Sequence, residues 1–291
     1  MKIRRIDERC SRCMRCVEDC ASGVWRMVDK IPVVVAPESC NRCGHCLSVC
    51  PENAIENDYL KTDQVRPVDK NRIDPAGYRE IALSRRSIRR YKNKPVDSAV
   101  IKDIIDLACF SPTASNSQHV AYTVITDPDR LRNISETVFS LARRFYGWSK
   151  TRSGRLIIKG LKQSAPIDQA LQKYIEPMEY YIELTESGRD LILHNAPALI
   201  LLHGPSVSFF ASDNCHIAAT NIANYAHALG LGTCFIGFVT LASRFHRRLC
   251  GLVELPKGRT LYASLVIGHP AFPHPNTASR KAPSVKWIDK K

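Results

Sequence analysis

The spacing of apolar positions predicts the secondary structure of the chain beyond residue 95. A helix is predicted to begin near Ser98, a residue type that caps helices, because apolar residues then recur with a period near 3.6: Val100, Ile101, Ile104, Ile105 and Ala108. Periodicity and cap-type residues predict two further helices, over residues 127–145 and 212–230. Short β-rich or apolar runs predict strands over residues 119–126, 197–204, 233–238 and 260–269. This alternation predicts an α+β domain with a central mixed sheet flanked by helices.

The first 60 residues are dominated by cysteine instead. Two groups occur, and each member of the second lies 30 residues beyond its counterpart in the first: Cys10, Cys13, Cys16 and Cys20, then Cys40, Cys43, Cys46 and Cys50. This is an internal repeat. Disulfides are disfavoured because the charged N-terminal stretch MKIRRIDER does not resemble a secretory signal. Zinc is the other alternative, but a third cysteine at the same two-residue spacing is unusual for a zinc knuckle.

The pattern Cys-x2-Cys-x2-Cys-x3-Cys, present twice, is that of bacterial ferredoxins, so this segment resembles a two-cluster ferredoxin. The resemblance implies two 4Fe-4S clusters, one held by Cys10, Cys13, Cys16 and Cys50, the other by Cys40, Cys43, Cys46 and Cys20. Pro51 follows Cys50 as in the family, whereas Ala21 follows Cys20. About 60 residues bury little core, so the clusters are expected to supply much of the stability of this segment.

Charge and composition divide the chain in the same place. Up to residue 60 there are nine basic and nine acidic residues, so the net charge of +14 lies entirely in the remainder. We predict a ferredoxin-like domain over residues 1–60, a polar, proline-containing linker over 61–76 and a second domain over 77–291. The basic remainder favours an anionic ligand, a nucleic acid or an anionic surface as partner.

No apolar run is long enough to predict a membrane span. Four further cysteines have no motif spacing and are interpreted as reduced, buried thiols: Cys109, Cys215, Cys234 and Cys250. Reduced thiols are typical of a cytoplasmic protein, which is the predicted location.

In the second domain, basic charge concentrates beside a serine at SRRSIRRY, residues 84–91. Arginines there could bind a phosphate, because guanidinium offers a rigid fork of donors to anionic oxygens. A solvated basic face is the alternative. Two other stretches follow, PTASNSQ at residues 112–118 and ALGLGTCFIGF at 228–238. In this order and at these distances, the three resemble the FMN-dependent nitroreductase family over almost the whole domain.

The resemblance implies an FMN site at the interface of a homodimer. Its phosphate would be bound by Arg85, Arg86, Ser87 and Arg89, and by Arg280 with Lys281 after the last strand. A segment from the other subunit would close over the flavin: Pro112, Thr113, Ala114, Asn116 and Gln118. Backbone donors at the flavin edge would come from Phe235, Ile236 and Gly237. The chain departs from the family at His119 and Val120, where Pro and Trp often stand, and has no acidic residue just before Gly237.

His119 is a candidate proton donor, since it replaces an apolar family residue near the flavin and histidine titrates near neutrality. The alternative is a histidine at the start of a strand that points into solvent.

The stretch from residue 130 to 162 has one acid, Glu136, against nine basic residues: Arg130, Arg132, Arg143, Arg144, Lys150, Arg152, Arg155, Lys159 and Lys162. An anionic substrate, an acidic redox partner or a solvated lid would suit this charge. Nucleic acid is disfavoured, because aromatic interleaving is thin and no binding module is present.

Together the two resemblances predict an iron-sulfur flavoprotein oxidoreductase. Clusters transfer one electron at a time, whereas FMN collects two, so one chain could pass electrons through two 4Fe-4S clusters to FMN. The predicted acceptor is an organic small molecule of the nitro, quinone or activated alkene type, and the predicted donor is a protein. One alternative is a non-catalytic protein that relays electrons between protein partners. Another, based on charge alone, is a redox-sensing regulator that binds nucleic acid.

Overall fold

The computed structural model describes residues 3–60, 65–161 and 165–289. It divides the chain into two compact units. The first comprises Met1–Asp74 together with Thr113–Gln118, and the second comprises Pro75–Pro112 and His119–Lys291. Lys162 of the predicted basic stretch and residues 61–64 of the predicted linker lie outside the described residues.

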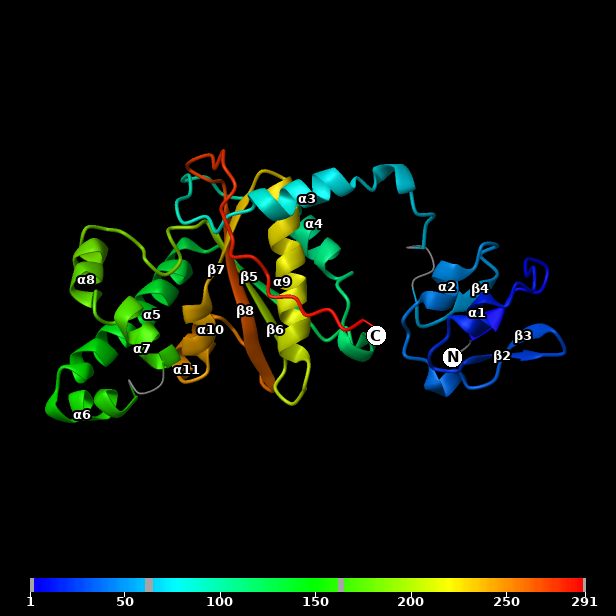
Figure 1. Ribbon diagram of the computed structural model, residues 1–291, viewed down its shortest axis with the longest axis horizontal. Coiled ribbons are helices and arrows are strands. Elements are labelled where there is room, and N and C mark those ends of the chain that lie inside the picture. Colours follow the sequence, from blue (N-terminus) through cyan, green and yellow to red (C-terminus); the bar gives the residue numbers. More distant parts are fainter. Residues whose placement is uncertain (1–2, 61–64, 162–164, 290–291) are drawn as a thin grey trace. The chain divides into compact units, whose positions relative to one another are not determined.

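The first unit contains two small antiparallel strand pairs and short helical turns (Figure 1). β1 (Ile3–Arg5) pairs with β4 (Ile55–Asn57), and β2 (Trp25–Val28) pairs with β3 (Ile31–Val34). The helical segments are α1 (Arg15–Glu18), α2 (His45–Val49) and the 3-10 turns η1 (Pro37–Ser39) and η3 (Lys70–Arg72). A small core is buried between these elements: Ile3, Cys16, Val24, Trp25, Leu47 and Ile55.

The internal repeat of the sequence is also a repeat of backbone geometry. Arg12 and Arg42 have left-handed φ angles of 58° and 57°. Met14 and Gly44, at the N-caps of α1 and α2, have φ angles of 61° and 78°. These turns bend the chain back between successive cysteines, so that side chains three residues apart can face one centre.

The second unit is built on a four-stranded sheet in the order β5-β6-β8-β7. The strands are β5 (Ala121–Ile125), β6 (Ala198–Pro205), β8 (Arg259–Gly268) and β7 (Gly232–Phe235), and every neighbouring pair is antiparallel. The α+β class is confirmed. The parallel component of the expected mixed sheet is a single bridge, between Ser87 and Thr233.

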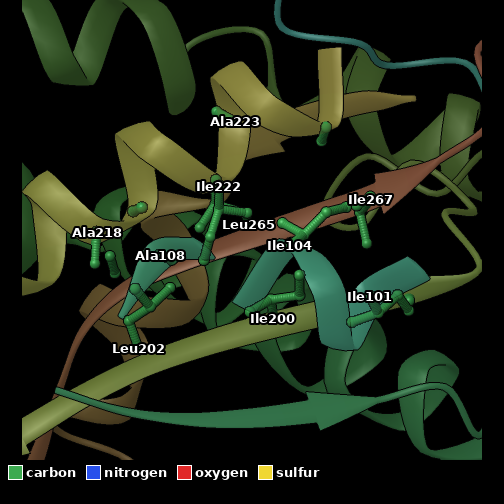
Figure 2. Close-up of a cluster of buried hydrophobic side chains, with 14 of the residues drawn as sticks. Ile101, Ile104, Ala108, Ile200, Leu202, Ala218, Ile222, Ala223, Leu265 and Ile267 are labelled. Carbon is green, nitrogen blue, oxygen red and sulfur yellow. The ribbon is translucent and has the colours of Figure 1, made fainter. Parts of the chain in front are cut away.

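Helices cover both faces of this sheet. α4 (Ser98–Ala108) and α9 (Ala211–Ala228) pack on one face, where Ile104, Ile200, Ile222 and Leu265 meet in one core (Figure 2). α5 (Pro128–Ser149), α10 (Gly237–Ser243) and α11 (Arg247–Leu252) pack on the other, with Leu199, Leu201 and Val266. Alternate residues of β6 and β8 thus enter two cores, which explains why these strands read as continuous apolar runs. The remaining helical segments are α3 (Pro75–Ser84), η4 (Ala114–Asn116), α6 (Arg152–Leu161), α7 (Ala165–Tyr174) and α8 (Met178–Glu186).

Two sequence predictions are corrected in detail. Asp97, rather than Ser98, is the N-cap of α4, because its carboxylate accepts a hydrogen bond of 2.8 Å from Ala99 N. The strand expected over residues 233–238 ends at Phe235, and Gly237 already begins α10. None of the helices within the described ranges is long and apolar enough to cross a membrane.

Candidate functional site

The first predicted set of cysteines is gathered around one cavity. The cavity is lined by these four cysteines, by residues between the first three of them and by a few residues from elsewhere in the unit: Cys10, Ser11, Cys13, Met14, Arg15, Cys16 and Cys50, with Arg5, Pro32, Ala54 and Ile55. Ala54 N donates a hydrogen bond of 3.2 Å to Cys50 Sγ. Burial, and then the neighbouring cysteines, raise the pKa of Cys16 to about 11. Burial disfavours the thiolate of Cys16 unless a cation offsets its charge, and four thiols around one cavity are the donor set that an iron-sulfur cluster requires.

The second set is related by the repeat. Burial raises the pKa of the Cys46 thiol, with smaller contributions from Cys40 and Cys43, whereas a hydrogen bond with the Trp25 side chain lowers it. Cys40 Sγ accepts a hydrogen bond of 3.4 Å from Arg42 N. Cys20, Cys40 and Cys46 pack against the same small core.

Among the residues that the structure describes, no three His, Cys, Asp or Glu side chains converge as a single metal ion requires. The fit of the first set therefore rests on its shared cavity and on its thiol donors, and the fit of the second on the mutual electrostatic influence of Cys40, Cys43 and Cys46.

In the second unit, the segment after α3 lies against the sheet and positions the predicted phosphate ligands. Ser87 forms the parallel bridge with Thr233, and Ile88 N donates a 2.9 Å hydrogen bond to Thr233 O. Gly232 permits this approach, since a Cβ atom added there would lie 2.4 Å from Ile88 Cγ1. The close contact fixes the backbone that carries Arg85 and Ser87 beside the end of β7.

This segment concentrates positive charge without neutralising it. Burial, and then the nearby charges of Arg86 and Arg280, lower the pKa of Arg85. Arg86 donates to the backbone oxygens of Leu83 and Ser84, at 2.7 and 3.3 Å, and Arg280 to Ser279 O at 2.9 Å. No ion pair found among the described residues includes Arg85, Arg86, Arg89 or Arg280. Guanidinium groups that crowd together without carboxylates suit a bound anion such as a phosphate.

His227 adjoins this arginine cluster and was missed by sequence reasoning. Its Nε2 atom lies 2.7 Å from Ser84 Oγ, and burial, followed by Arg85 and Arg86, lowers its pKa. It stands near the end of α9, far from SRRSIRRY in sequence, so no local pattern links the two. Lys281 is exposed.

The predicted flavin-edge residues lie where β7 gives way to α10. Phe235 is exposed and Ile236 is buried, and Ile236 N donates to Ser264 O at 2.8 Å. That donor is therefore engaged within the protein. A Cβ atom on Gly237 would meet nothing within 4 Å, so the space beside it is open. Phe238 packs edge-on against Tyr174 of α7, with ring centroids 5.0 Å apart.

The predicted covering segment is divided between the units. Thr113, Ala114, Asn116 and Gln118 belong to the first unit, and Pro112 to the second. Ser115, Asn116 and Gln118 all have left-handed φ angles, of 52°, 51° and 49°. Several non-glycine residues in this conformation within one short segment cost free energy, and such backbone strain is common in ligand-binding loops.

His119 is exposed, and its backbone is what the structure engages. Arg259 Nη2 donates to His119 O at 2.5 Å and to His203 O at 2.8 Å, while its Nε donates to His203 Nδ1 at 2.7 Å. His203 Nε2 lies 3.2 Å from Thr123 Oγ1. Burial, and then Arg259, lower the pKa of His203, which keeps its ring neutral as an acceptor. This network anchors the chain just after the predicted covering segment.

Comparisons with known proteins identify both halves of the chain. A model of the Nitroreductase family matches residues 82–269, and one of the 4Fe-4S dicluster domain matches residues 9–55. A curated protein named NADH dehydrogenase, from Thermus thermophilus, is 39% identical over 61 residues, which are 21% of this chain and 30% of that protein. The chain thus spans less than a third of this relative's length.

Two further matches concern the separate halves. An uncharacterised ferredoxin of Methanocaldococcus jannaschii is 35% identical over 46 residues, which are 16% of this chain and 74% of that protein. Among solved structures, a nitroreductase with bound FMN from Desulfitobacterium hafniense matches with a TM-score of 0.52 at 17% identity. That alignment covers 73% of this chain and 98% of the other, and it shows a shared fold.

Proposed function

The chain belongs to the nitroreductase family and carries a 4Fe-4S dicluster domain, and we propose that it is an FMN-dependent oxidoreductase that passes electrons from a protein donor to an organic acceptor. The acceptor would be a nitro compound, a quinone or an activated alkene. When bound, the clusters supply one-electron transfer and FMN supplies two-electron reduction. The protein would act as a homodimer with FMN at the subunit interface.

In this proposal the arginine cluster, Gly237 and the cysteines have separate binding roles. Arg85, Arg86 and Arg280 hold the FMN phosphate through charge-assisted hydrogen bonds, and Ser87 adds a hydroxyl donor. Arg89 carries further positive charge toward the flavin, and Gly237 leaves room at its edge. The eight predicted cysteines hold the two clusters.

The observation that carries the proposal is the arginine cluster beside β7. Arg85 is partly buried among like charges, an arrangement that costs free energy in the free protein and is relieved by an anion. In a family whose solved relatives include a nitroreductase with bound FMN, the phosphate of FMN is the anion that fits.

The test compares the full chain with a shortened chain that begins at Asn71. The residues that form the two cores of the second unit all lie beyond Arg90, so the shortened chain should fold and bind FMN. Flavin reduction is then measured anaerobically with a strong chemical reductant and with a reduced ferredoxin. We expect the shortened chain to respond to the chemical reductant and to lose reduction by ferredoxin. Cys20→Ala in the full chain should give a milder loss, because one cluster keeps its four ligands.

Two results would contradict the proposal. Equal rates with ferredoxin in all three proteins would show that the dicluster domain is not the entry for electrons. Rapid flavin reduction in the full chain without turnover of nitro, quinone or alkene acceptors would instead favour a relay between protein partners.

A further inference from the structure

A cavity of about 420 Å³ lies beside α5, in the middle of the basic stretch. α5 contributes Phe139, Arg143 and Arg144, and the chain between α8 and β6 contributes Leu191 and Ile192. The volume falls within the range of small-molecule sites, which are typically apolar with a few placed polar groups. A cavity lined by apolar side chains and two arginines suits a ligand that has both a hydrocarbon body and a negative charge.

The half-buried acidic group of this lining, Asp190, already has hydrogen-bond partners. Asp190 Oδ1 accepts hydrogen bonds from Ser135 Oγ at 2.5 Å and from Ile192 N and Leu193 N at 2.9 Å. Its Oδ2 atom accepts one from Asn195 N at 3.1 Å. The carboxylate therefore fixes the turn before β6 and has little capacity left for a cation in the cavity.

Three cations of the stretch are paired, and those without an ion pair among the described residues divide into two that line the cavity, Arg143 and Arg144, and three that do not, Arg152, Arg155 and Lys159. Arg130, Arg132 and Lys150 form ion pairs with Glu254, Asp129 and Glu179. Arg143 and Arg144 have no ion pair or hydrogen bond among the described residues, although both line the cavity. The one acid that shares the lining besides Asp190 is Glu136, two helical turns earlier on α5.

The cavity is linked to the predicted flavin site through the turn that Asp190 fixes. His194 follows in that turn, and its pKa is lowered chiefly by burial, with Asp190 opposing the shift and Arg89 adding to it. His194 is thus within electrostatic reach both of a cavity residue and of a predicted flavin ligand. Ile192 and Phe139 of the cavity lining also pack in the same hydrophobic core as Ile236, one of the predicted flavin-edge residues.

We propose that this cavity binds the carboxylate end of the acceptor, so that the compounds reduced by the protein are organic carboxylates. Arg143 and Arg144 contribute the charge-assisted hydrogen bonds, and Phe139, Leu191 and Ile192 contact the hydrocarbon body. The inference rests on the proposed function, because it assigns the substrate class of that enzyme.

The first test measures binding and needs no turnover. Isothermal titration of the purified, cofactor-loaded full chain uses benzoate and its neutral counterpart benzyl alcohol. We expect benzoate to bind more tightly, and the double variant Arg143→Gln/Arg144→Gln to weaken it about 10-fold or more. Glu136→Gln should strengthen benzoate binding, since it removes a like charge. Arg132→Gln is the matched control, on the same helix but outside the cavity, and should change nothing.

The second test measures turnover with 4-nitrobenzoate and 4-nitrobenzyl alcohol. The double variant should raise KM for the carboxylate and leave KM for the alcohol unchanged. Equal benzoate affinity in the original and the double variant would overturn the site. Arginine-dependent benzoate binding with no effect on KM for 4-nitrobenzoate would overturn its role toward the acceptor. If binding depends on the arginines but no nitro compound, quinone or activated alkene is reduced, the carboxylate site stands and the proposed function fails.

Discussion

The hydrophobic core of the first unit has six buried residues between strands of three or four residues. The second unit has a core on each face of a sheet whose central strands have eight and ten residues. Burial of apolar surface can therefore stabilise the second unit without a bound cofactor. In the first, Cys16 is itself part of the core, and the chain between the cysteines turns at residues with left-handed φ angles: Arg12, Met14, Arg42 and Gly44. The comparison indicates that its fold depends on what the cysteines bind.

Removal of the clusters should produce the largest difference in stability between the two units. We expect a chelator with an oxidant to unfold the first unit completely, because its cysteines then lose the clusters that tie the two groups of the repeat together. Strands β6 and β8 should keep their structure, since no cysteine of the repeat enters their cores. Hydrogen exchange followed by mass spectrometry resolves the two regions in one sample.

Added iron and sulfide should restore protection in the first unit only. Persistent protection of β1 and β4 after complete loss of iron would mean that the small core is sufficient, and the contrast between the units would fail.

The next effect concerns flavin affinity. Replacing Arg85 or Arg280 with Ala should cost about 1.5–3 kcal/mol of FMN binding, because each removes a charge-assisted hydrogen bond to the phosphate. The expected increase in Kd is about 10- to 150-fold. Fluorescence titration of the flavin-free protein measures it.

Arg248→Ala is the control, because Arg248 is an exposed residue of α11 with no predicted role. Iron content should be the same in all these proteins. FMN affinity that is unchanged in both Arg85→Ala and Arg280→Ala would remove these residues from the proposed site.

Several of these features could be read from the sequence because their signals are local. The cysteine spacing revealed the resemblance to a ferredoxin, and the structure gathers one ligand set that this resemblance implies around a single cavity: Cys10, Cys13, Cys16 and Cys50. The four strands of the sheet followed from short apolar runs. The N-cap of α4 was misplaced by one residue, since Asp97 and Ser98 are both cap-type residues and only backbone geometry selects between them.

Other features depend on contacts between distant parts of the chain. Gly232 lies in the stretch ALGLGTCFIGF, and nothing local in that sequence shows that it must admit Ile88. The Arg259 network with His203 joins two neighbouring strands and a loop, so it appears only once β6 and β8 are paired. Such residues require a register that single-sequence patterns do not supply.

Gly232 gives a third, smaller test of how the second unit holds its phosphate segment. Ala at this position would place Cβ 2.4 Å from Ile88 Cγ1, which forces the segment away from β7. Overpacking of this kind costs about 1–3 kcal/mol. We expect a lower melting temperature and weaker FMN binding together.

The matched control is Gly251→Ala in α11, where an added Cβ meets nothing within 4 Å. Ala is favoured over Gly in a helix, so this change should be neutral or stabilising. If Gly232→Ala lowers the melting temperature and leaves FMN affinity intact, the contact serves the fold alone.

The smallest expected effect is a pH dependence that belongs to the second unit. Burial, and then Arg259, place the pKa of His203 below the ordinary value of 6.5. Between that folded pKa and about pH 6.5 the unfolded chain binds the proton more readily, so the free energy of unfolding decreases as the pH falls. Above pH 6.5 this contribution is fully present. It amounts to roughly 1.4 kcal/mol for each unit by which the two pKa values differ.

His203→Gln should flatten the dependence, because an amide can accept from Arg259 and does not titrate. His194 and His227, whose pKa values are also lowered, will maintain part of the slope in the variant. The measurement is urea unfolding between pH 7.5 and about 5, monitored at β6 and β8 so that the first unit does not contribute. His274→Gln, a change at an exposed position, is the control. A slope identical to that of the original chain would show that His203 takes up its proton within the folded network, and that the bond from Arg259 does not hold it neutral.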